Sequence, residues 1–103
     1  MSVPSFHGEC KTPGGKLVIV DFDLLNHRLH NVRVSGDFFL YPEEALADIT
    51  AALEGLPDDC MESFIAERVQ SAMPAGTVWL GSSPAALAAA VRRALSASLE
   101  SAR

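Results

Sequence analysis

Cysteine is scarce in this chain, and its scarcity excludes several kinds of site. Only Cys10 and Cys60 occur, far apart in the sequence and without a Cys-x-x-Cys pair. A disulfide framework needs more cysteines, and a zinc site needs about four Cys or His ligands at characteristic spacing. The three histidines, His7, His27 and His30, form no such cluster with them. We therefore expect neither a metal site nor a disulfide framework, and we expect a reducing, cytoplasmic location.

Long apolar runs and positive charge are also lacking. The strand-sized apolar runs, such as residues 17–20 and 38–41, are far shorter than the roughly 20 residues that span a bilayer. The first ten residues lack the basic and apolar segments of a signal peptide. The net charge is −5, whereas non-specific nucleic-acid binding depends on cations that neutralise phosphates. We predict no membrane partner, no nucleic-acid partner and a single domain, 1–103, with one core.

The first half of the chain carries the patterns of strands. Strands are predicted over three runs that lie between turn-forming residues: 16–25, 29–35 and 37–40. Asn26 and His27 supply a hairpin turn between the first two runs, and Gly36 predicts a bulge or sharp bend before the third. Strict alternation places His30 on the apolar side of the second run. Residues 1–12 form a short, polar segment of mixed composition, and we expect a loose terminus there.

The second half carries the patterns of helices. Pro42 opens the first helix, Asp58 or Asp59 caps the second, and Ser83 with Pro84 starts a third that runs to about residue 99. Strands followed by helices predict an α+β fold. We expect a small antiparallel sheet of about three strands with helices packed on one face.

A glycine-rich turn between the only two lysines is the first candidate site. Lys11 and Lys16 bracket Gly14 and Gly15. Glycines let a backbone approach a ligand closely, free N–H groups in such a turn bind anions, and lysine is a point-charge partner for phosphate. The alternative is a tight turn with two solvated lysines. The spacing is not that of a Walker A loop, because Leu17 stands where Ser or Thr is required.

A bend with two adjacent phenylalanines is the second candidate site. Gly36 and Asp37 precede Phe38 and Phe39. Adjacent residues of a strand point to opposite faces, so one ring fills the core and the other lies under another element or under a partner. This geometry indicates an interface, and burial of both rings within the domain is the alternative.

Catalytic constellations are not evident. Cys10 has only His7 as a nearby base, and no Ser/His/Asp set or carboxylate pair stands out. We therefore predict no catalytic residues and no cofactor of the chain's own.

The two candidate sites belong to a longer set of motifs that resembles a known domain. The motifs are His7-Gly8-Glu9-Cys10-Lys11-Thr12-Pro13-Gly14-Gly15-Lys16-Leu17-Val18, Ser35-Gly36-Asp37-Phe38-Phe39, Pro42-Glu43-Glu44, Leu53-Glu54-Gly55 and Leu80-Gly81-Ser82-Ser83-Pro84. Together they resemble the C-terminal domain of lipoate–protein ligases, which some members encode as a separate small subunit. The fold of that domain is similar to that of SufE/NifU-like iron–sulfur assembly proteins.

The resemblance implies a function that composition does not. The family forms lipoyl-adenylate from ATP and lipoate and transfers the lipoyl group to a lysine of a lipoyl-acceptor domain. The catalytic subunit holds the reactive lysine, so this chain would be an accessory, non-catalytic partner that helps to complete the adenylation site. Lys11, Gly14, Gly15 and Lys16 would then lie near phosphate or partner, and Gly36 to Phe39 would form the structural or interface signature. Two alternatives remain: a sulfur-transfer or iron–sulfur scaffold, although two cysteines are too few for a scaffold, and a purely structural interaction module.

Overall fold

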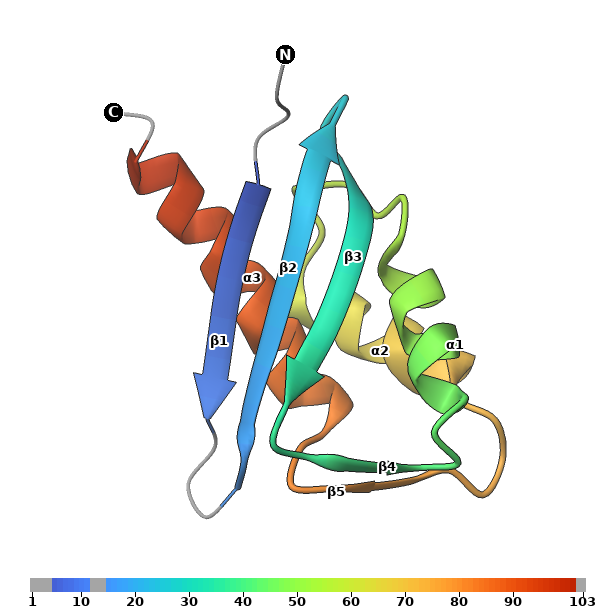
Figure 1. The fold of residues 1–103 in the computed structure, drawn as a ribbon. Coiled ribbons are helices and arrows are strands. Elements are labelled where there is room, and N and C mark those ends of the chain that lie inside the picture. The colour runs from blue at the N-terminus through green and yellow to red at the C-terminus, as the bar shows by residue number, and fades with distance from the viewer. Residues whose placement is uncertain (1–4, 12–14, 102–103) are drawn as a thin grey trace.

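Three antiparallel strands form the main sheet in the computed structural model, which describes residues 5–11 and 15–101 (Figure 1). The strands are β1 (Ser5–Lys11), β2 (Leu17–Leu25) and β3 (Arg28–Gly36), in the order β1-β2-β3. The helices are α1 (Ala45–Leu53), α2 (Glu62–Ala72) and α3 (Pro84–Ser101). Helix α3 packs across β1 and β2, α1 packs against β3, and α2 lies against both helices. The prediction of an α+β fold with helices on one face of a three-stranded antiparallel sheet is confirmed.

Strand β1 corrects the expectation of a loose terminus. Its residues pair in register with β2, and Phe6 stacks on Phe22 with ring centroids 5.5 Å apart. Gly8 faces α3 so closely that a Cβ atom there would lie 2.1 Å from the carbonyl oxygen of Ala90. The strand is hard to see in the sequence because glycine occupies one of its core-facing positions, where an apolar side chain is expected.

The turn between β2 and β3 is as predicted, but the register after it is not. Asn26 and His27 both have positive φ, 52° and 63°, as a type I′ hairpin turn requires. Asn31 also has positive φ, and the pairing shifts between Asp21 and Asp23. This bulge moves the alternation by one residue, so Leu29 is fully buried and His30 is not. The placement of His30 on the apolar side is therefore wrong.

The predicted third strand belongs to a second, smaller sheet. Strand β4 (Phe39–Tyr41) pairs antiparallel with β5 (Val78–Leu80), and this two-stranded ribbon lies across one end of the main sheet (Figure 1). Gly36 causes the separation, because its φ of 146° turns the chain out of the β3 direction. The main sheet still has three strands, because β1 takes the place predicted for β4.

Of the three predicted helix starts, only the one at Ser83 agrees with the structure. Helix α1 begins at Ala45, so Pro42 does not open it but lies in the turn before it. Ser83 accepts the Ala86 N–H at 3.1 Å and caps α3. Gly55, with a φ of 78°, follows the end of α1. Neither Asp58 nor Asp59 caps α2, which begins after Met61 without a side-chain cap. Asp58 instead receives hydrogen bonds from His27 and from Arg92, and these bonds hold the turn before α2 in place.

Within residues 5–11 and 15–101, no helix is both long and apolar enough to cross a bilayer.

Candidate functional site

Backbone hydrogen bonds join three separate segments of the chain at the end of the sheet that carries the ribbon. The Lys16 N–H donates to the Gly81 carbonyl at 2.8 Å, and the Asp37 N–H donates to the Leu17 carbonyl at 3.0 Å. The start of β2, the bend after β3 and the link between β5 and α3 are thereby held together. We call this arrangement the three-segment joint.

Two glycines allow the joint to close. A Cβ atom on Gly36 would lie 2.1 Å from the Leu17 carbonyl oxygen, and one on Gly81 would lie 2.6 Å from Cγ of Lys16. Both residues have φ in the range that favours glycine, 146° and 89°. Position 36 therefore requires glycine for two reasons, its φ and its close contact with the Leu17 backbone. At position 81 a Cβ atom would meet the Lys16 side chain, which is flexible and can move aside.

The lysines lie at the edge of this joint. Lys11 ends β1 and pairs in register with Leu17, and both Lys11 and Lys16 are exposed. Gly15 is half-buried, while Gly14 lies outside the described residues. The Lys16 stem rests against Gly81, three residues before α3 begins, and the start of a helix carries partial positive charge. Lys16 and the start of α3 thus supply positive charge at the joint, next to the exposed carboxylate of Asp37.

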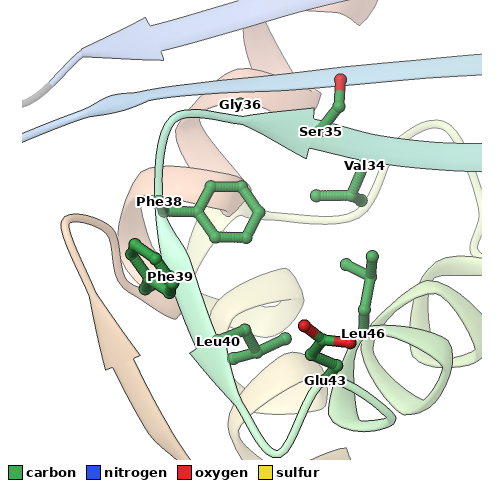
Figure 2. A pocket seen from close by; sticks show the side chains of 8 residues that line it. All are labelled: Val34, Ser35, Gly36, Phe38, Phe39, Leu40, Glu43 and Leu46. Atoms are coloured by element: carbon green, nitrogen blue, oxygen red, sulfur yellow. The ribbon is translucent and has the colours of Figure 1, made fainter.

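The adjacent phenylalanines take opposite roles. Phe38 is half-buried and packs on Trp79, with ring centroids 5.4 Å apart and planes tilted by 59°. Phe39, by contrast, is 78% exposed. Figure 2 shows the Phe38 ring turned toward Val34 and the Phe39 ring turned away from it.

One face of the β4–β5 ribbon is apolar and exposed. Phe39 lies opposite Leu80 and Tyr41 opposite Val78, with exposed fractions of 78%, 62%, 74% and 47%. We call these four side chains the ribbon face. The other side of the ribbon, Leu40 and Trp79, packs on the core. Of these four residues, only Phe39 is among the candidates that the sequence indicates, since three-residue strands carry too little alternation to show a face.

A shallow groove lies beside the ribbon face, between β3, β4 and α1. Its volume is about 560 Å³. The described residues that line it are Val34, Ser35, Gly36, Phe38, Phe39, Leu40, Glu43 and Leu46 (Figure 2). Glu43 is the one charged member of this set, so the groove combines apolar side chains with one carboxylate at its wall.

Two polar atoms near the joint are buried without a hydrogen-bond partner among the described residues. They are Nε1 of Trp79 and Oγ of Ser82. Trp79 lies in β5, and Ser82 lies in the segment that connects β5 to α3. Hydrogen-bonding capacity at this end of the molecule is thus not fully used within the described part of the chain.

The histidine and cysteine side chains form no nucleophile–base pair in the described residues. His7 bonds to Glu9 and Asp21 on the sheet face away from α3, with nitrogen–oxygen distances of 2.7 Å, and Cys10 is buried on the opposite face. The hydrogen bonds to Glu9 and Asp21 raise the pKa of His7. Desolvation raises the pKa of the Cys60 thiol, which makes it a poorer nucleophile at neutral pH. In the part of the chain that is described, no three His, Cys, Asp or Glu side chains are arranged to hold a metal ion.

These features define a small α+β fold with an apolar ribbon and a glycine–lysine joint at one end. No family model matches the chain, and no curated protein matches its sequence significantly. A solved structure does match in fold, with a TM-score of 0.62 and 24% sequence identity over 88% of this chain and 96% of the other. It comes from a structural analysis of an archaeal lipoylation system, a bi-partite lipoate protein ligase and its E2 lipoyl domain, from Thermoplasma acidophilum. At this identity the match shows a shared fold.

Proposed function

We propose that this chain is the accessory part of a lipoate–protein ligase. It docks on a catalytic subunit and supports the ATP-dependent adenylation of lipoate, and hence the lipoylation of acceptor domains. The observation that carries the proposal is the three-segment joint. Lys16, Asp37 and Gly81 come from three motifs that resemble the ligase domain, and backbone hydrogen bonds bring them to one place. The fold shared with a chain of a bi-partite lipoate protein ligase system supports the same proposal.

The chemistry explains why an accessory part would help. An acyl-adenylate is lost to water unless the site is closed, and a second protein surface over the site excludes water. A lysine near the phosphates stabilises the charge that develops when pyrophosphate leaves. In this proposal the chain supplies the closing surface and the charge of Lys11 and Lys16, while ATP and lipoate bind in the complex with the catalytic subunit.

The direct test measures pyrophosphate release from ATP and lipoate. The chain alone is expected to be inactive, and adding it to the catalytic subunit of the same organism is expected to accelerate the reaction. Turnover by the chain alone, or no acceleration in the mixture, would contradict the proposal. Binding without acceleration would favour the purely structural module instead.

Replacement of Lys16 by Ala tests the role of the joint. A charge-assisted contact to phosphate contributes about 1.5–3 kcal/mol. If the contact forms mainly in the transition state, adenylation in the complex slows by about 10- to 150-fold. Arg68, an exposed cation on α2, provides the matched control, and Arg68→Ala should leave the rate unchanged. If Lys16→Ala and Lys11→Ala together change neither the rate nor the affinity, residues 11–16 are only a turn.

A further inference from the structure

The ribbon face is an exposed apolar surface on a rigid base. Leu40 and Trp79 anchor the two strands in the core, so Phe39, Tyr41, Val78 and Leu80 must point outward together. A fully exposed aromatic side chain presents about 150–250 Å². Phe39 and Tyr41 alone thus approach the roughly 300–600 Å² of the largest apolar patch on a typical monomer, a patch that is often functional. A standard interface buries about 800 Å² on each partner, and its centre is its most apolar part. The area of the ribbon face is that expected of such a central apolar patch.

The segments on either side of β4 are acidic, while Lys16 lies beside the end of β5. Asp37 precedes β4, and Glu43 and Glu44 follow it. All three side chains are exposed, and none takes part in an ion pair within the described parts of the chain. Glu43 also stands at the wall of the adjoining groove. A partner that covers this surface would match it with an apolar patch bordered by Lys or Arg, because complementary charge at a rim guides association.

The ribbon face is continuous with the three-segment joint. Leu80 is followed directly by Gly81, whose carbonyl accepts the Lys16 N–H. A partner seated on the ribbon therefore brings its own surface next to Lys16. This continuity indicates which partner covers the ribbon, because the joint is the part of the molecule assigned above to the ligase reaction.

We infer that the ribbon face is the surface through which this chain docks on the ligase catalytic subunit, whose matching surface is apolar and bordered by basic residues. The identity of the partner rests on the proposed function. The location of the contact rests on the exposure of the four side chains and on the acidic residues beside them.

The test measures the dissociation constant between the full chain and the catalytic subunit of the same organism by calorimetry. Phe39→Asp and, separately, Leu80→Asp should each weaken binding at least about 30-fold, as loss of a central interface residue does. Glu43→Lys should slow association and reverse part of its salt dependence. Met61 and Phe64, exposed by 71% and 44% near the start of α2, supply matched controls, and Met61→Asp and Phe64→Asp should bind like the wild type. Melting temperatures verify that each variant is folded.

The outcomes separate the inference from the proposed function. If the wild type binds and accelerates the catalytic subunit but the two ribbon variants bind equally well, the surface is wrong and the function stands. If the wild type forms no complex, both are overturned. If the wild type is a dimer that Phe39→Asp dissociates, and the resulting monomer still binds the catalytic subunit with full affinity, the ribbon face joins two copies of this chain and the inference fails.

Discussion

Replacing Gly36 by Ala tests whether the joint is as tightly closed as the geometry indicates. The Cβ atom of the new alanine would lie 2.1 Å from the Leu17 carbonyl oxygen, so β2 and the bend after β3 must move apart. Such overpacking costs about 1–3 kcal/mol. The φ of 146° is also unfavourable for alanine, at a cost of about 1–3 kcal/mol. Together the two terms reach about 2–6 kcal/mol, a large part of the 5–15 kcal/mol that typically stabilises a protein of this size.

Urea and thermal unfolding followed by circular dichroism measure the effect. At about 4–8 °C per kcal/mol, the melting temperature should fall by at least about 8 °C. Gly55→Ala is the control, because Gly55 also has positive φ, 78°, but a Cβ there meets nothing within 4 Å. It should cost only the conformational term, about 1–2 kcal/mol. Equal unfolding midpoints for the two variants would show that the contact with Leu17 is not tight, and the account of the joint would be wrong.

Three further predictions concern titratable side chains. The hydrogen bonds of His7 to Glu9 and Asp21 hold its pKa above the ordinary 6.5, so an NMR titration should find it raised, and Glu9→Gln with Asp21→Asn should return it toward 6.5. The linked stabilisation is present below the unfolded pKa and is lost as pH rises through the folded value; a stability that increases with pH over that window would contradict this. The Cys60 thiol should react with a disulfide reagent at neutral pH more slowly than an unstructured cysteine peptide, because desolvation raises its pKa. Cys10→Ser with Cys60→Ser should leave acceleration of the catalytic subunit intact, and its loss without unfolding would support sulfur transfer instead.

The parts of the fold that follow from the sequence are those with a local signal. The alternation of Val18, Val20 and Phe22 places them in the core, where all three are fully buried. Asn26 tolerates positive φ and starts the hairpin turn, and Ser83 caps the helix that follows it. In each case a few consecutive residues contain the whole physical cause, so no knowledge of distant contacts is needed.

The parts that do not follow depend on contacts between distant segments. β1 is held by the close approach of Gly8 to α3, and a glycine gives no hydrophobic pattern. The pairing of β4 with β5 joins residues about forty positions apart through three-residue strands, for example Phe39 with Leu80. The bulge at Asn31 reverses the expected positions of Leu29 and His30, and alternation alone contains no sign of it.

The candidate site likewise combines residues that have a local signal in the sequence with contacts between distant segments that have none. The loop at Lys16 and the bend at Gly36 stand out in the sequence, because lysines are few and glycines punctuate strands. Their meeting with Gly81 is a tertiary fact that only the backbone hydrogen bonds reveal. The other members of the ribbon face, such as Tyr41 and Val78, had no signal of their own.

The ribbon face and Lys16 are expected to contribute to different steps, docking and adenylation, and kinetic measurements can distinguish the two contributions. Trp79 and Leu40 fix the backbone of the ribbon, so the backbone has little freedom to lose when a partner covers it, and the exposed side chains contribute chiefly to affinity. Lys16, at the edge of the joint, would contribute to the charge of the transition state and little to affinity. A docking defect disappears when the accessory chain saturates its partner, whereas loss of a transition-state contact persists at saturation. Excess Phe39→Asp chain should therefore restore the adenylation rate and excess Lys16→Ala chain should not. If both defects vanish at saturation, Lys16 is also a docking residue, and the charge that assists adenylation must come from the catalytic subunit itself.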